Sequence, residues 1–156
     1  MPKQSAGLLL YRRGEAGLEV LLAHPGGPLW ARKDLGAWSI PKGEFLEDEA
    51  PLAAARREFA EEIGTRVEGE ALALTPLKQP SRKVIHAFAV EQNLDVERIT
   101  SNLFEMEWPP KSGRTQAFAE VDRAAWFGLG EARKRIQPGQ VPILDELARR
   151  LGDAVR

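Results

Sequence analysis

Apolar residues along the chain follow two periods, and the change from one to the other predicts strands separated by helices. Two mostly apolar stretches, residues 5–13 and 18–24, are joined by a short connection that contains glycine, which predicts a β-hairpin. Residues 83–92 form an apolar run typical of a buried strand. Further strands are expected at residues 38–43, at 66–79 with bends, near the end of 95–107, and at 117–127.

Helical periodicity predicts a helix between Pro51 and Gly64, because proline suits a first helical turn and glycine suits a left-handed C-terminal cap. Its apolar positions recur at three- and four-residue spacing: Leu52, Ala55, Phe59 and Ile63. Two more helices are predicted at residues 129–136 and 141–151. Strands, a helix, more strands and a helical C-terminus together indicate an α/β or α+β fold with helices packed on a sheet.

The other face of the first predicted helix is acidic. Glu58, Glu61 and Glu62 stand at positions i, i+3 and i+4, so their like charges repel one another. Arg57 can pair with Glu61 at i+4 but cannot neutralise all three carboxylates. A hard divalent cation such as Mg²⁺ takes oxygen ligands and commonly bridges carboxylates to phosphates. The pattern therefore predicts a metal site, with a solvated acidic helix face as the alternative.

Length, charge and cysteine content narrow the classes of protein. With 156 residues, 29% of them charged and 43% hydrophobic, the chain is expected to form one domain over residues 1–156. A net charge of −1 gives no reason to expect a stable nucleic-acid partner or a membrane surface. The absence of cysteine excludes disulfides and thiolate chemistry and fits a cytoplasmic protein. No signal-peptide pattern or membrane-spanning apolar run is recognised.

The stretch from Gly43 to Thr65 resembles the Nudix box, G-x5-E-x7-R-E-U-x-E-E-x-G-U, in which U is a bulky apolar residue. All seven fixed positions match: Gly43, Glu49, Arg57, Glu58, Glu61, Glu62 and Gly64. Phe59 fills the first U position, whereas Thr65 departs from the pattern at the last, where Val67 is expected to take over the packing. The preceding Trp38-Ser-Ile-Pro-Lys-Gly resembles the lead-in found in the same family.

This resemblance implies an α/β/α sandwich around a mixed sheet and the hydrolysis of a phosphoanhydride in a nucleoside diphosphate linked to another group. It implies Mg²⁺ or Mn²⁺ as cofactor. The implied metal ligands are the backbone carbonyl of Gly43 and the carboxylates of Glu58, Glu61 and Glu62, with Glu58 and Glu61 also counted as catalytic. Glu49 and Arg57 are implied to pair and to brace the box loop against the helix.

Nudix sites often add one carboxylate from outside the box, as a metal ligand or a general base. Glu120 is the first choice for both roles, because it lies six residues before Trp126, a Glu-before-Trp arrangement that resembles several family members. Glu105 and Glu107 are the alternatives, and a surface glutamate is the competing interpretation of each.

Three residues are expected to contact substrate: Lys42, Arg32 and Trp30. Tyr11, Phe88 and Trp108 are further candidates for stacking on a base, although core packing is the commoner use of such residues. His24 and His86 each stand alone in sequence and are interpreted as structural.

The substrate is expected to be a small nucleotide. Dinucleoside polyphosphates and modified nucleoside triphosphates come first, with ADP-ribose as the alternative. A catalytically silent nucleotide-binding module of the same fold stays open as a different class of function. The sequence gives no indication of oligomeric state.

Overall fold

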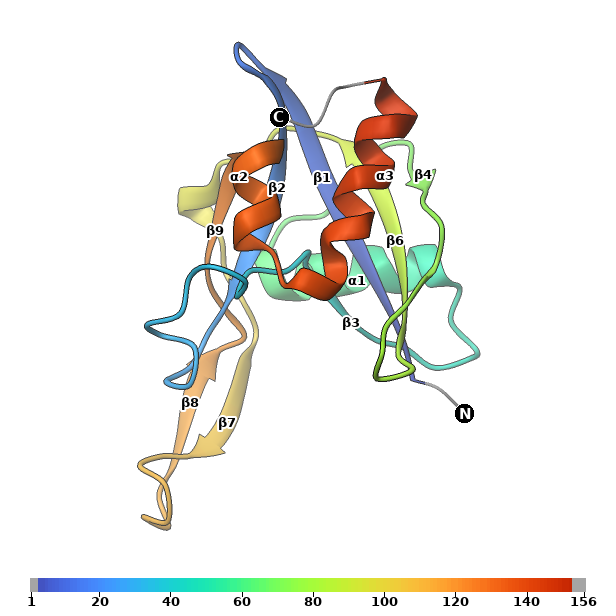
Figure 1. Ribbon diagram of the computed structural model, residues 1–156. Helices are drawn as coiled ribbons and strands as arrows, with labels where there is room; N and C mark the ends of the chain where they lie inside the picture. Colours follow the sequence, from blue (N-terminus) through green and yellow to red (C-terminus); the bar gives the residue numbers. More distant parts are fainter. Residues whose placement is uncertain (1–2, 153–156) are drawn as a thin grey trace.

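Figure 1 shows the computed structural model, which describes residues 3–152. The strands are β1 Gln4–Gly14, β2 Gly17–Pro25, β3 Lys42–Glu44, β4 Leu72–Ala73, β5 Leu77–Lys78, β6 Val84–Glu91, β7 Leu103–Glu107, β8 Thr115–Ala119 and β9 Val121–Gly128. The helices are α1 Pro51–Ile63, α2 Leu129–Arg135 and α3 Val141–Leu151, with short 3-10 turns η1 Val96–Arg98 and η2 Pro138–Gln140.

A mixed sheet forms the centre of the molecule. Its strand order is β4-β6-β1-β2-β9, with β3 paired to the start of β1 and β5 paired to β6. The pairing of β1 with β6 is parallel, whereas β1 pairs antiparallel with β2 and β3. Strands β7 and β8 form a separate antiparallel ribbon that extends away from the body of the molecule (Figure 1).

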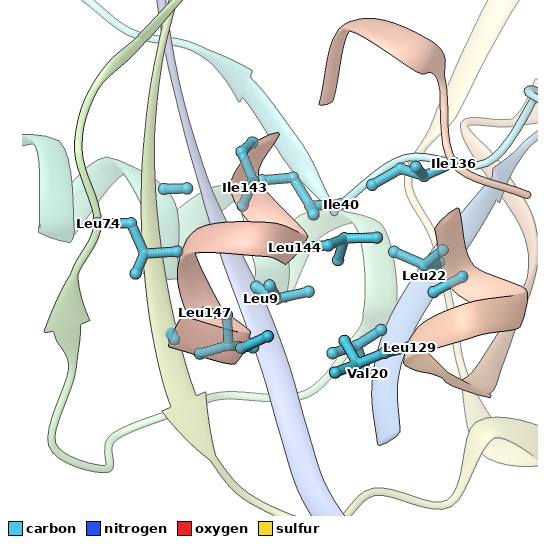
Figure 2. Close-up of a cluster of buried hydrophobic side chains, with 14 of the residues drawn as sticks. Leu9, Val20, Leu22, Ile40, Leu74, Leu129, Ile136, Ile143, Leu144 and Leu147 are labelled. Carbon is cyan, nitrogen blue, oxygen red and sulfur yellow. The ribbon is translucent and has the colours of Figure 1, made fainter. Parts of the chain in front are cut away.

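Helices cover both faces of the sheet, so two apolar layers enclose the central strands. Alternate residues of a strand point to opposite faces, and on β1 the fully buried Leu8 and Leu10 join the layer under α1, while Leu9 joins the layer under α2 and α3. Figure 2 shows this second layer, where Leu9 lies among side chains of α3 such as Leu144 and Leu147. The predicted α/β/α sandwich around a mixed sheet is confirmed.

Helix α1 begins and ends where its sequence predicts. Pro51 lies in the first turn, and Gly64 ends the helix at φ 87°, a left-handed conformation that residues other than glycine rarely adopt. A Cβ at Gly64 would also lie 2.1 Å from the Thr100 hydroxyl oxygen. The backbone N–H of Thr100 donates to the carbonyl of Ile63 at 2.9 Å, so the end of α1 is tied to the segment that leads into β7.

Three predicted strands differ from the structure. Over residues 38–43, Trp38 and Ser39 form only isolated bridges, and Pro41 precedes the short strand β3. Over residues 66–79 the pairing is limited to β4 and β5, each of two residues. The single strand predicted at 117–127 is two strands in different sheets, β8 and β9, which meet at Glu120.

Within residues 3–152, none of the helices combines the length and apolar character that crossing a bilayer requires.

Candidate active site

Four carboxylates from two parts of the chain meet beside the C-terminal half of α1. Glu58, Glu61 and Glu62 come from the helix, and Glu120 comes from the junction between β8 and β9. The charges of Glu58 and Glu120 act on Glu62, and the charge of Glu61 acts on Glu120, which places all four within electrostatic reach of one another. The structure therefore brings together the acidic residues that the sequence predicted as a set.

Backbone hydrogen bonds hold Glu120 at this position. Its N–H donates to the carbonyl of Asn102 at 2.8 Å, and the N–H of Asn102 donates to the carbonyl of Glu61 at 2.8 Å. On the other side, the N–H of Gly26 donates to the carbonyl of Glu120 at 2.9 Å. Glu120 is thus fixed relative to both α1 and the loop that follows β2.

Glu62 is the most perturbed of the four carboxylates. Burial, and after it the charges of Glu58 and Glu120, raise the pKa of Glu62 to about 8. The charge of Lys42 and a hydrogen bond from the Lys42 backbone act in the opposite direction. A carboxyl held in this way gains from any positive charge that arrives beside it.

Glu58 lies directly against the backbone of the box loop. Its side chain is only 12% exposed, and a Cβ built on Gly43 would fall 2.1 Å from the Glu58 carboxyl carbon. Only glycine leaves room for this approach, which explains why the first position of the motif needs it. Burial raises the pKa of Glu58, although the hydrogen bond and charge of Arg57 oppose that shift.

Glu120 shows the same trend from a more open position. The residue keeps exposed surface, yet desolvation of its carboxyl raises the pKa of Glu120, and the charge of Glu61 raises it further. A carboxyl with a raised pKa is a better proton acceptor once ionised.

Arg57 braces the loop that precedes α1, as the family resemblance implied. Its Nε and Nη2 donate to the two oxygens of Glu49, each at 2.9 Å, in a bidentate pair. The hydrogen bond from Arg57 is the main cause that lowers the pKa of Glu49. The third nitrogen, Nη1, donates to Glu58 at 2.9 Å and to Glu61 at 3.3 Å, so the same guanidinium also reaches the acidic cluster.

Of the three residues predicted to contact substrate, Lys42 lies beside the carboxylates. Burial lowers the pKa of Lys42, while the charges of Glu62, Glu44 and Glu58 oppose that change. Trp30 lies elsewhere, in the wall of a cavity of about 370 Å³ that Glu120 also lines. Arg32 is exposed, and within the described part of the chain it has no hydrogen-bond or ion-pair partner. The structure does not bring Arg32 into contact with the other two.

The alternatives to Glu120 lie outside the cluster. Glu105 and Glu107 are exposed on the β7–β8 ribbon, and the Glu107 carboxylate accepts a hydrogen bond from the Lys111 backbone N–H at 2.9 Å near the ribbon's tip. His24 is fully buried and contacts the carbonyl of Lys33 and the carboxylate of Asp122, which agrees with a structural role. Tyr11 and Phe88 pack against the two core layers.

The donor set fits a hard divalent cation by its chemistry. The side chains available are carboxylates with a surplus of negative charge, close to the backbone of Gly43. Among residues 3–152, however, no group of three or more His, Asp or Glu side chains is already gathered around a common point. The hydrogen bonds of Arg57 to Glu58 and Glu61 hold two of the carboxylates toward the guanidinium instead.

Two residues that line the cavity with Trp30 and Glu120 were not singled out from the sequence: Phe104 and Met106. No local pattern marks them, because the loop and the ribbon that meet there are far apart in the chain. A second cavity of about 420 Å³ lies at the box loop and includes Phe45, Leu46 and Glu49. None of the four clustered carboxylates lines that second cavity.

Comparisons with known proteins agree with the motif and the fold. The family model of the NUDIX domain matches residues 1–147. An octanoyltransferase of Myxococcus xanthus is 31% identical over 101 residues, which are 65% of this chain. The matched part spans about a quarter (25%) of that curated relative's length.

Solved structures share the fold at low sequence identity. The NUDIX domain of Shewanella oneidensis NrtR, crystallised with ADP ribose, has a TM-score of 0.67 and 16% identity, covering 97% of this chain and 89% of that one. An Ap4A hydrolase of C. elegans has a TM-score of 0.64 and 20% identity, covering 95% and 98% of the two chains. At such identities these likenesses describe the fold alone.

Proposed function

The chain belongs to the Nudix family, and from that premise we propose that it is a hydrolase that cleaves a phosphoanhydride bond in a nucleotide with a divalent cation, Mg²⁺ or Mn²⁺. The observation that carries this proposal is the environment of Glu62. Burial and two neighbouring carboxylates raise its pKa to about 8, so the chain itself stabilises the ionised form of Glu62 poorly. An arrangement of this kind is typical of a site prepared for a cation.

The proposed reaction adds water across a P–O–P bond. The water oxygen forms a bond to one phosphorus atom, and the bridging oxygen leaves on the other phosphate with the electron pair of the broken bond. One proton of the water is released. Negative charge on both phosphates opposes this attack, so the site needs positive charge near the phosphates and a base near the water.

The residues divide these tasks. Glu58, Glu61 and Glu62 with the Gly43 carbonyl would hold the cation, and Glu120 would serve as a further ligand or as the base. When bound, a divalent cation supplies charge that offsets the phosphates and makes the attacking water more acidic. Glu120 is suited to accept the proton because it stands between the carboxylates of α1 and the cavity that contains Trp30.

Basic residues near the site support binding of the phosphates. Lys42 lies next to Glu62 and Glu58, and we propose that its ammonium group contacts a phosphate oxygen. Arg32, which is exposed, is proposed as a second phosphate contact that moves to the substrate when it binds. Arg57 keeps Glu49 and the box loop in place rather than contacting substrate.

The substrate class is proposed among three groups of nucleotides. Dinucleoside polyphosphates and modified nucleoside triphosphates come first, and ADP-ribose is the alternative. The fold is shared with an Ap4A hydrolase and with a domain crystallised with ADP ribose, so these likenesses do not separate the groups.

A screen of all three groups tests the proposal. Purified protein is incubated with each nucleotide in the presence of Mg²⁺, Mn²⁺ or EDTA, and the products are separated by ion-exchange chromatography. We expect metal-dependent release of a nucleoside monophosphate from at least one group. Glu62→Gln is the negative control, and Glu105→Gln, which changes an exposed carboxylate away from the cluster, is the matched positive control.

A silent nucleotide-binding module predicts a different outcome. In that case the wild-type protein releases no product with any metal, yet nucleotides still raise its melting temperature. Turnover in EDTA equal to that in Mg²⁺ would reject the role of the cation.

A further inference from the structure

The cavity that contains Trp30 is formed by two segments from distant parts of the chain. One is the loop after β2, which contributes Gly27, Leu29 and Trp30, and the other is the β7–β8 ribbon, which contributes Phe104 and Met106. The cavity measures about 370 Å³, and Glu120 lies in its wall. Ligand pockets of this size are typically apolar, with few polar groups.

Close backbone contacts fix the two walls against each other. A Cβ built on Gly26 would fall 1.8 Å from the carbonyl oxygen of Ala119, at the base of the ribbon. Gly27 has φ 93°, and a Cβ there would lie 2.9 Å from the ring of Phe104. Glycine at both positions lets the loop pack directly on the ribbon and places Phe104 in the cavity.

The chemistry of the lining is aromatic and aliphatic. Of the described residues that line the cavity, Glu120 alone carries a charge. Leu29 is 60% exposed and lines the cavity, so its apolar side chain is open to a ligand there. The N–H of Gly26 is already used by the Glu120 carbonyl, and the carbonyl of Gly27 already accepts from the Trp30 N–H at 3.4 Å.

The position of Glu120 connects this cavity to the carboxylates of α1. Its charge acts on Glu58 and Glu62, and its residue also lines the cavity. A molecule whose apolar end filled the cavity would therefore extend its other end toward the acidic cluster. In a nucleotide, the apolar end is the base and the other end is the phosphate chain.

We infer that this cavity binds the base of the nucleotide, with Trp30 and Phe104 as the aromatic contacts and the β7–β8 ribbon as a specificity-determining element. The inference rests on the proposed function, because it assumes that the phosphates lie at the carboxylates. The inference assigns binding roles to Phe104, Met106 and Leu29. The bound base would cover the apolar side chains that the ribbon contributes to the cavity.

The same lining predicts tolerance among bases. A pocket that reads a base needs donors and acceptors aimed at its edge, and such a pocket rejects the wrong base strongly. Apart from Glu120, which is assigned to the reaction, the side chains that line the cavity offer rings, a thioether and an aliphatic group, and the backbone groups of Gly26 and Gly27 named above are occupied. Stacking does not distinguish strongly between bases, since each has a π face. Selection of the substrate then depends mainly on its phosphates.

Binding of nucleoside monophosphates tests this inference without requiring turnover. AMP, CMP and ribose 5-phosphate are titrated into the protein with Mg²⁺ present, and dissociation constants are measured by calorimetry. Tryptophan fluorescence is followed in parallel. We expect AMP and CMP to bind within about tenfold of each other, and ribose 5-phosphate, which lacks the base, to bind roughly 10- to 100-fold more weakly than AMP. Trp30→Phe removes the fluorophore from the cavity and is expected to lose most of the fluorescence change.

Variants of one strand supply the matched comparison. Phe104→Ala is expected to weaken AMP binding roughly 10- to 100-fold and Phe104→Leu by a smaller factor, because leucine keeps apolar volume but not the ring. Leu103→Ala removes an apolar side chain that is 65% exposed and does not line the cavity, so it should leave binding within about twofold of wild type. Circular dichroism confirms that each variant is folded.

The outcomes separate this inference from the proposed function. Equal binding of AMP and ribose 5-phosphate, or AMP binding by Phe104→Leu and Phe104→Ala as tight as that of Leu103→Ala, would overturn the base site even if the enzyme turns over nucleotides. A CMP affinity more than about a hundredfold below that of AMP would overturn the tolerance among bases. Tight, base-dependent binding without any hydrolysis would support the cavity and reject the hydrolase proposal.

Discussion

Helices α1 and α3 lie on opposite faces of the sheet, and each carries a glutamate shielded from solvent: Glu62 on α1 is partly buried and Glu146 on α3 is buried. The Glu146 carboxylate accepts hydrogen bonds from the Thr75 N–H at 2.9 Å, from the Thr75 hydroxyl at 3.0 Å and from Arg150 at 3.2 Å. Glu62 receives a hydrogen bond from the Lys42 backbone but faces the charges of Glu58 and Glu120.

The difference separates a carboxylate that holds the fold together from one that prepares a site. Among the described residues, each hydrogen-bond partner of Glu146 is a donor, so its carboxylate is bonded within the protein and links α3 to the loop between β4 and β5. Around Glu62 the largest neighbouring charges repel it, and the positive charge required to balance them is expected from outside the chain. Five predictions test this comparison.

The largest effect is expected from Glu62→Gln. Losing one ligand of the cation removes several kcal/mol of charge stabilisation, which corresponds to a fall in kcat of roughly 10³-fold or more. The melting temperature in EDTA should be unchanged or higher, because the variant no longer buries a repelled carboxylate. Steady-state kinetics and calorimetry check both parts. Unchanged activity would reject Glu62 as a ligand.

Glu120→Gln is expected to slow turnover by at least about 10²-fold if Glu120 is the base. The pH profile of kcat should lose its acidic limb in this variant, because glutamine cannot accept the proton. A loss below a few-fold would assign the role to another carboxylate.

Metal should stabilise the protein through the cluster. At a concentration about 100 times its dissociation constant, Mg²⁺ adds roughly 2.7 kcal/mol to the free energy of unfolding. For a chain of this size that raises the melting temperature by roughly 5–10 °C. Scanning calorimetry with Mg²⁺ and with EDTA measures the shift. Retention of the full shift in Glu62→Gln would contradict the assignment.

Glu146→Gln should give the converse result. We expect the free energy of unfolding to fall by about 1–3 kcal/mol, because charge-assisted hydrogen bonds to Thr75 and Arg150 are weakened. Turnover should stay within a few-fold of wild type. Urea denaturation and steady-state kinetics test the two halves, and a large loss of kcat with unchanged stability would erase the contrast between the helices.

The smallest effect concerns a satisfied but exposed carboxylate, Asp34. The hydrogen bond from Trp38 lowers the pKa of Asp34 below its ordinary value of 3.8. Hydrogen bonds from Arg135 and the charge of Arg135 lower it in the same direction. The folded pKa is the lower one, so this stabilisation is present above that ordinary value and is lost as the pH falls through the folded pKa. The difference in melting temperature between wild type and Asp34→Asn should therefore shrink below about pH 4. A difference that grows on acidification would contradict this.

The sequence predicted the parts of the fold and site that depend on local spacing. The ends of α1 follow from Pro51 and Gly64, and the acidic cluster follows from helical positions 58, 61 and 62. The pairing of Arg57 with Glu49 was implied by the family resemblance and is present at 2.9 Å. The metal-binding and catalytic roles of these residues, and the expectation of one domain over residues 1–156, stay predictions.

Features that depend on distant parts of the chain were not predictable. The break between β8 and β9 occurs at Glu120, where no glycine or proline marks it in the sequence. Hydrogen bonds to the backbones of Gly26 and Asn102, which are distant in the chain, hold Glu120 there. The cavity likewise arises only when the loop at Gly27 packs on Phe104. Interactions between such distant segments leave no periodic signal in a single sequence.

Direct titration of Mn²⁺ tests the central claim, that the carboxylates of α1 and Glu120 exist to hold a divalent cation. Free Mn²⁺ is measured by electron paramagnetic resonance as the metal is added to wild type, Glu62→Gln and Glu146→Gln. The account predicts saturable binding by wild type and Glu146→Gln that competes with Mg²⁺, and at least about tenfold weaker binding by Glu62→Gln. Equal binding by all three proteins, or no binding by wild type, would contradict it.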